Sequence, residues 1–168
     1  IVDKNKPFEI SDIYGKYFIL DEYTNEKGNY IKKIQFERTG LILEKYKYGN
    51  CPKDYYQPTV QNIGYYGNCR DKRFIDYFGK NLLLWIRKWE NMIRRCYNEN
   101  RDNYKHYNDI FVSEKFKCCE YFLDWVIENN KFDKKYLSIL QVDKDYYSSN
   151  CYSEDTCVII PEKFNKYI

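Results

Sequence analysis

The stretch that decides the fold is YLSILQVDKDYYSSNCYSEDTCVIIPEKFNKYI, residues 136–168. Its composition predicts one strand over residues 136–145 and, after a polar turn, a second strand over residues 156–160. A short helix is expected to begin at Pro161, because proline suits the first position of a helix. The stretch therefore predicts a strand–turn–strand–helix unit.

Three side chains with oxygen ligands fall at the ends of these expected elements. Asp143 and Asp145 close the first strand, and Asn165 lies on the terminal helix. Carboxylate and amide oxygens suit Mg²⁺, Mn²⁺ or Ca²⁺, so the unit predicts a site for one hard divalent cation. The alternative is a pair of strand-end carboxylates that are neutralised by a nearby lysine such as Lys144.

Two helices are expected before this unit. Residues 81–100 carry apolar side chains at intervals of three and four, as in one buried helical face: Trp85, Trp89, Met92, Ile93 and Cys96. A short strand follows near residue 111, and then a second helix runs to about Asn129, with Ser113 as its N-cap. The expected buried side of that helix is Phe116, Cys119, Phe122, Leu123 and Val126.

The first third of the chain is expected to be β-structure. Three stretches rich in Ile, Leu, Phe and Tyr predict strands at residues 16–24, 30–37 and 41–48. Residues 50–68 contain two Pro and two Gly without a sustained period, which indicates a long loop or an extended arm. The predicted class is α+β, with a β-rich module over residues 1–69 and a second domain over residues 70–168.

Charge is concentrated in the middle of the sequence. The chain has 28 basic and 25 acidic residues, and residues 70–117 hold 12 of the basic and 7 of the acidic ones. This excess suits a surface that faces phosphate groups, although a solvated helix face is the alternative. The candidates for contact with DNA are Arg87, Lys88, Arg94 and Arg95 on the first helix, with Tyr65 and Tyr66 in the arm. The two tyrosines could instead only fill a surface rich in tyrosine, since the chain contains 20 of them.

Several classes of protein are excluded by the sequence. No run of 18 apolar residues is present, so no membrane-spanning segment is expected, and the common glycine-rich nucleotide-binding loops are absent. Seven cysteines without a C-x-x-C pair predict reduced thiols in a cytoplasmic setting, with a zinc site built on Cys51 and Cys69 as the alternative. The lone histidine, His106, lies in a polar stretch.

Several segments, taken in order, resemble one known family. They are FERTG (36–40), QPTVQNIGYYGN (57–68), WENMIRRCY (89–97), YNDIFVSEKFKCCEYFLDWV (107–126), VDKD (142–145) and CYSEDTCVIIPEKFN (151–165). Together they are similar to the phage-encoded relatives of HNH-type homing endonucleases, over roughly residues 8–168. The resemblance implies an HNH-like ββα-metal element, double-stranded DNA as the partner, and Mg²⁺ or Mn²⁺ as the cofactor of an active enzyme.

The resemblance also implies roles for individual residues. Asp143 takes the position of the metal-binding aspartate, and Asn165, 22 residues later, takes the metal-binding position on the helix. Lys144 stands where the relatives have the histidine that acts as general base, and Thr156 stands where they have the asparagine that orients it. A lysine is cationic at neutral pH, which makes it a poor base.

Two hypotheses follow for the function. The first is a metal-dependent DNA endonuclease of a phage or mobile element that hydrolyses phosphodiester bonds in the cytoplasm of a bacterial host. The second is a nuclease-derived protein that binds without cutting and needs no cofactor. Its partner would be DNA or a host defence protein that the phage inhibits.

Overall fold

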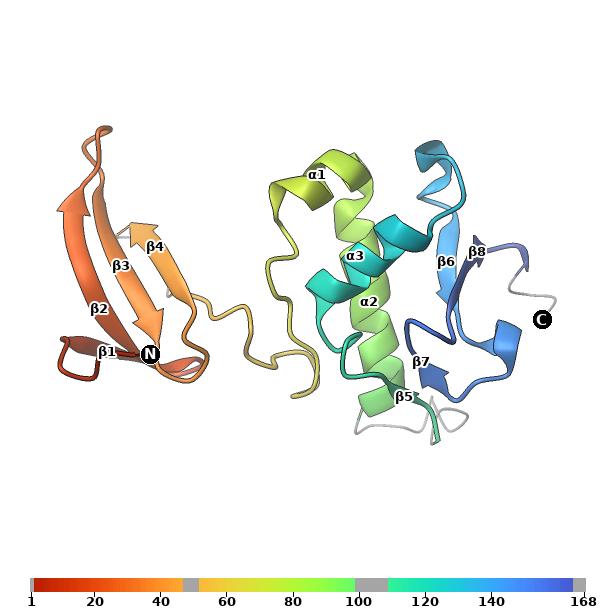
Figure 1. Cartoon of the computed structure of the whole chain (residues 1–168), viewed down its shortest axis with the longest axis horizontal. Helices are drawn as coiled ribbons and strands as arrows, with labels where there is room; N and C mark the ends of the chain where they lie inside the picture. The colour runs from red at the N-terminus through yellow and green to blue at the C-terminus, as the bar shows by residue number, and fades with distance from the viewer. Residues whose placement is uncertain (1, 47–51, 99–108, 165–168) are drawn as a thin grey trace. The chain divides into compact units, whose positions relative to one another are not determined.

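The computed structural model describes residues 2–46, 52–98 and 109–164 of the chain and has mixed α and β structure (Figure 1). The chain forms two compact units, Ile1–Gln57 and Pro58–Ile168. The α+β class expected from the sequence is confirmed. The division lies 12 residues before the expected boundary after residue 69.

The first unit is a four-stranded antiparallel sheet in the order β1-β2-β3-β4. Its strands are β1 (Phe8–Ser11), β2 (Gly15–Thr24), β3 (Tyr30–Phe36) and β4 (Ile42–Tyr46). The last three correspond to the three predicted strands, whereas β1 was not predicted from the sequence. A small core of Tyr17, Ile34 and Phe36 lies on one face of this sheet. The turns before β3 and β4 contain Gly28 and Gly40, both with a positive φ that favours glycine.

The second unit is built around one long helix. Its helices are α1 (Lys72–Phe78), α2 (Leu82–Tyr97) and α3 (Cys119–Asn129), and all five residues expected on the buried face of α2 are buried. The indole N–H of Trp85 donates to the Leu137 carbonyl at 3.1 Å, and that of Trp89 donates to the Phe116 carbonyl at 2.7 Å. These bonds tie α2 to the segments that lead into α3 and into the C-terminal strands. No helix in the described part of the chain is long and apolar enough to cross a membrane.

The start of α3 differs from the expectation. The helix begins after Cys118 rather than after Ser113, so the predicted N-cap is wrong. Ser113 instead accepts a hydrogen bond from the Phe116 backbone N–H at 3.3 Å within the preceding turn, and its hydroxyl donates to Glu154 at 3.1 Å. The five residues expected on the buried side, by contrast, are all buried.

Residues 58–69 belong to the second unit because they pack and pair within it. The Tyr65 backbone N–H donates to Lys117, and the Cys119 N–H donates to Tyr65, both at 2.9 Å. A Cβ at Gly64 would lie 3.0 Å from the Trp89 ring, so a larger residue there would need the ring to move by a few tenths of an ångström. The loop predicted over residues 50–68 therefore serves partly as a cover for α2.

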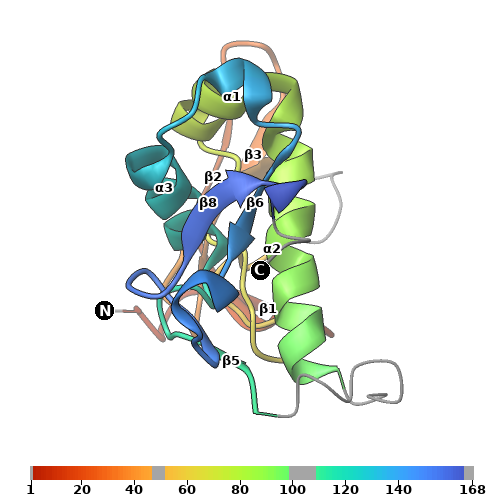
Figure 2. The ribbon, with the colours of Figure 1, turned by 90° about the vertical axis from the view of Figure 1, so that its right-hand side faces the viewer.

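Two short pairs of strands complete the second unit beside α2 and α3 (Figure 2). The parallel pair is β5 (Phe111–Val112) with β7 (Cys151–Tyr152), and the antiparallel pair is β6 (Leu140–Asp143) with β8 (Val158–Pro161). The two predicted strands are present with different bounds, as β6 and β8, and the predicted turn between them contains β7, which was not predicted. Pro161, however, ends β8 and pairs with Leu140, so it does not open a helix there. The second half of the expected terminal helix, residues 165–168 with Asn165 included, lies outside the described residues.

Candidate functional site

Asp143 lies at the end of β6, opposite Val158 of β8. The pairing of these strands draws the carboxylate into the protein, where only 3% of the residue is exposed. Burial of an aspartate is uncommon unless the carboxylate is paired or bound to a metal. Its surroundings therefore decide what it can do.

The two oxygens of Asp143 differ in their partners. Oδ1 accepts a hydrogen bond from the Asp145 backbone N–H at 2.5 Å. Oδ2 is buried and has no hydrogen-bond partner among the described residues. A buried carboxylate oxygen without a partner carries a free-energy cost that a bound cation would offset. The arrangement therefore fits a hard divalent cation at Oδ2.

The neighbouring ammonium group does not neutralise that oxygen. Lys144 has a side chain only 5% exposed, and its Nζ forms an ion pair with the carboxylate of Asp145, which is 61% exposed. The same Nζ lies 5.7 Å from the centre of the Tyr152 ring. The side chain of Lys144 is thus engaged with Asp145, and an ammonium group has no lone pair with which to accept a proton from water.

Thr156 occupies the turn between β7 and β8. Its hydroxyl donates to the Cys151 carbonyl at 2.5 Å and lies 2.8 Å from the hydroxyl of Ser153. These contacts shape the turn that leads from β7 to Val158, opposite Asp143. Among the described residues, no contact supports the role implied for Thr156, the orientation of a base at position 144.

A metal at Asp143 would have few protein ligands. In the described part of the chain, no group of three or more His, Cys, Asp or Glu side chains could hold a metal ion. Mg²⁺ commonly keeps several waters and takes one or two carboxylates together with phosphate oxygens of the substrate. One carboxylate oxygen at Asp143 is consistent with that pattern, and Asn165, the other expected ligand, lies outside the described residues.

The cysteines do not form the alternative zinc site within the described structure. All six cysteines there are free thiols. Cys69 and Cys119 share a hydrogen bond, which lowers the pKa of Cys69, while burial raises that of Cys119. Cys51 and the lone histidine, His106, lie outside the described residues.

A small pocket opens between α2 and β6. It has a volume of about 80 Å³, and we call it the α2–β6 pocket. Its lining is Lys88, Asn91, Met92, Arg95, Phe122, Gln141, Val142 and Tyr152. Two of the four basic candidates on α2, Lys88 and Arg95, therefore meet at the strand that carries Asp143.

The other basic candidates on α2 lie elsewhere on the helix. Arg94 pairs with Glu90 at 3.7 Å, and Glu90 also accepts a hydrogen bond from the hydroxyl of Tyr66 at 2.6 Å. The ring of Tyr66 packs on Trp89 with 5.4 Å between centres, and burial raises the pKa of the Tyr66 hydroxyl. Arg87 is exposed and does not line the pocket.

Tyr65 is held by its backbone rather than presented as an aromatic platform. It pairs with Cys118, and burial raises the pKa of its hydroxyl. Tyr65 and Tyr66 thus anchor the loop to α2 and α3, and neither lines the α2–β6 pocket.

Sequence reasoning did not single out the amides of the pocket. Asn91 follows Lys88 by three residues and precedes Arg95 by four, so the three share one stripe of α2. That spacing could have identified Asn91. Gln141 could not be found in this way, because its contact depends on where β6 packs against the helix.

Comparisons of the chain with protein-family models, with curated proteins and with solved structures find no match.

Proposed function

We propose that this protein binds double-stranded DNA and hydrolyses its phosphodiester bonds with a divalent cation, Mg²⁺ or Mn²⁺, held at Asp143 within an HNH-like ββα-metal element. The single observation that carries the proposal is the buried Asp143 Oδ2, which has no partner among the described residues. The resemblance of the sequence to HNH-type endonuclease relatives adds the expectation that Asn165 supplies a second ligand.

The division of tasks follows from the contacts of each side chain. Asp143 holds the cation, which when bound neutralises charge on the phosphate and its leaving oxygen. Lys88 and Arg95, on the wall of the α2–β6 pocket, attract the DNA backbone. Lys144 balances Asp145 and keeps positive charge near the phosphate without accepting a proton.

The test is cleavage of supercoiled plasmid DNA by the full chain with Mg²⁺ or Mn²⁺, with EDTA as the control for metal. Nicked or linear products that require the metal support the proposal. Plasmid that stays intact with both metals, at protein concentrations that bind all of it, contradicts hydrolysis.

One observation favours a second candidate, a protein that binds DNA without cutting it. The position of the general base holds Lys144, whose ammonium group is committed to Asp145. Lys144 is therefore a poor candidate for the general base beside Asp143. Retention of DNA that falls steeply with salt, together with intact plasmid, would establish this second function.

A further inference from the structure

The described residues that line the α2–β6 pocket are rich in hydrogen-bond donors and include no carboxylate. Four of its side chains end in N–H groups: Lys88, Asn91, Arg95 and Gln141. The lining also includes apolar side chains such as Met92 and Phe122. Two cations and two amide N–H donors without a carboxylate among them suit an anion, because hydrogen bonds from ionised donors to anionic oxygens are stronger than neutral ones.

Lys88 is the most constrained of these donors. Its Nζ donates to the Leu140 carbonyl and lies 4.9 Å from the centre of the Trp85 ring. Burial lowers the pKa of this ammonium group, and the charge of Glu162 acts in the opposite direction. Within the described structure no carboxylate lies within ion-pair distance of Nζ, so a half-buried charge stays without a direct counterion.

Like Lys88, Arg95 lacks a carboxylate partner among the described residues, and in this it differs from its neighbour Arg94. Arg94 has Glu90 as its partner, whereas the described residues provide no ion pair for Arg95. Both side chains are exposed and both belong to the last turn of α2. Only Arg95 lines the pocket. Substitutions of the two arginines therefore remove the same charge, one inside the pocket and one outside it.

We infer that the α2–β6 pocket is a binding site for one phosphate oxyanion, held by Lys88, Asn91 and Arg95 from the helix and by Gln141 from the strand. The volume of about 80 Å³ decides the size class of the ligand. It holds a few water molecules or one phosphate group, and it is well below the roughly 300–1,000 Å³ of pockets that enclose whole small molecules.

The position of the pocket suggests which phosphate it takes on DNA. Gln141 and Asp143 are two residues apart on β6, so they share a face of the strand and are separated by about 6.6 Å along it. One nucleotide step along a DNA strand is of the same order. The pocket then holds the phosphate next to the one at Asp143, and this assignment rests on the proposed function. The affinity of the pocket for a free anion does not depend on the proposed function.

The test compares three variants of the full chain: Arg95→Gln, Lys88→Met and the matched control Arg94→Gln. Methionine keeps most of the packing of the lysine stem against Trp85. The first measurement is the thermal stabilisation produced by inorganic phosphate, with chloride at equal ionic strength as the reference. We expect phosphate to raise the Tm of the wild type and of Arg94→Gln, and to have no effect on the other two variants.

The second measurement is binding to a short labelled DNA duplex across a range of salt concentrations. We expect Arg95→Gln and Lys88→Met to weaken binding about fivefold to tenfold each and to reduce the salt slope by about one. Arg94→Gln should change the affinity less than twofold. Loss of the phosphate effect without a change in DNA affinity would show that the pocket takes free phosphate and not the backbone.

Two outcomes would overturn the inference. One is an equal response of Arg94→Gln and Arg95→Gln in both measurements, because the charge of the helix and not the pocket would then be responsible. The other is the absence of any phosphate effect in the wild type. Failure of the proposed hydrolysis is a separate result, since it is read from plasmid cleavage and not from phosphate or duplex binding.

Discussion

Two pockets of the second unit each contain two cationic side chains, but among the described residues the cations have carboxylate partners in only one of them. The α2–β6 pocket has Lys88 and Arg95 and no acidic residue. The second, which we call the α3 pocket, is lined by Arg73, Lys115, Phe116, Tyr121, Asp124, Trp125, Glu128 and Glu154. It is also larger, with a volume of about 350 Å³.

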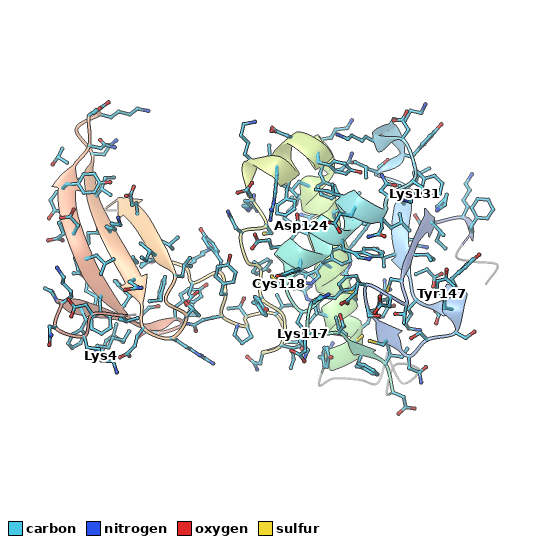
Figure 3. The ribbon with its side chains drawn as sticks, in the orientation of Figure 1. Lys4, Lys117, Cys118, Asp124, Lys131 and Tyr147 are labelled. Atoms are coloured by element: carbon cyan, nitrogen blue, oxygen red, sulfur yellow. The ribbon has the colours of Figure 1, made fainter. Side chains whose placement is uncertain are left out.

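The cations of the α3 pocket all have partners. Arg73 contacts Glu120 at 2.9 Å and Asp124 at 3.0 Å, and Lys115 contacts Glu154 at 2.8 Å. Asp124 lies on α3, where Figure 3 labels it. Charges paired in this way hold elements together, whereas Lys88 and Arg95 of the α2–β6 pocket have no carboxylate partner among the described residues and can attract an anionic ligand. We therefore expect substitutions that break these ion pairs to change stability, and substitutions of the cations in the α2–β6 pocket to change binding.

The largest expected effect is on catalysis at Asp143. Asp143→Asn keeps an acceptor for the Asp145 N–H but removes the charge that holds the cation. We expect plasmid cleavage to fall by about 1,000-fold or more, since metal-assisted stabilisation of the leaving group is lost. The control is Asp155→Asn, which removes an exposed carboxylate from the nearby turn and should leave cleavage unchanged.

The stability of Asp143→Asn shows whether the charge of Asp143 serves function or supports the fold. Because Asp143 Oδ2 is buried without a partner, removal of its charge should leave the free energy of unfolding unchanged or raise it by about 1 kcal/mol. Urea unfolding followed by tryptophan fluorescence measures this, and all three tryptophans lie in the second unit. A loss of stability would instead mean that the charge of Asp143 supports the fold.

The second prediction concerns a variant that gives the two cations of the α2–β6 pocket a carboxylate partner. Asn91→Asp places a carboxylate three residues after Lys88 and four residues before Arg95, a spacing that favours ion pairs on a helix. We expect affinity for the DNA duplex to fall about tenfold, because the cations gain an internal partner and the anion meets a negative charge. Asn91→Ala, which removes the amide without adding charge, should weaken binding only slightly.

The third prediction concerns Glu120, which joins three segments next to the α3 pocket. It accepts the Asn68 backbone N–H at 2.8 Å and the Arg73 guanidinium at 2.9 Å. Glu120→Ala should lower the free energy of unfolding by about 1 kcal/mol without changing DNA affinity. Glu128→Ala, at an exposed position of the same helix, is the control and should change stability by less than about 0.5 kcal/mol. Weaker DNA binding by Glu120→Ala would contradict the distinction between ion pairs that affect stability, at the α3 pocket, and cations that affect binding, in the α2–β6 pocket.

The sequence predicted the elements better than the boundaries and contacts. Periodicity identified α2 and the buried side of α3, because amphipathic helices repeat their apolar residues in a regular way. It missed β1, whose four residues are too few to show alternation, and it misplaced the start of α3 at Ser113. Both errors concern positions where tertiary contacts, not local preference, decide the outcome.

The candidate site was predictable only in part. Asp143 stood out because a carboxylate ends an apolar strand, and the structure shows it buried with a free oxygen. The spacing of Glu90 and Arg94 indicates their ion pair, but spacing does not show the difference between a stripe of α2 that faces β6, as that of Arg95 does, and one that faces solvent. Such a difference depends on packing between segments distant in the sequence.

The smallest expected effect is the pH dependence contributed by Glu154. The hydrogen bond from Lys115 is the main cause that lowers the pKa of this carboxyl, and the hydroxyl of Ser113 acts in the same direction. A carboxyl with a lowered pKa in the folded state binds fewer protons there than in the unfolded chain. Its contribution to stability is therefore present above the ordinary pKa of 4.5 and is lost as the pH falls through the lowered value.

Glu154→Gln should accordingly melt about 2 °C below the wild type near pH 6, and the difference should shrink as the pH falls below 4. The ion pair with Lys115 is partly exposed, so the effect is small and should weaken at high salt. Asp124 works in the opposite direction, because burial raises its pKa, and the comparison of wild type with Glu154→Gln cancels that contribution. A difference in Tm that grows on acidification would show that Glu154 is more readily protonated in the folded protein, and that its partners in the α3 pocket do not stabilise its charge.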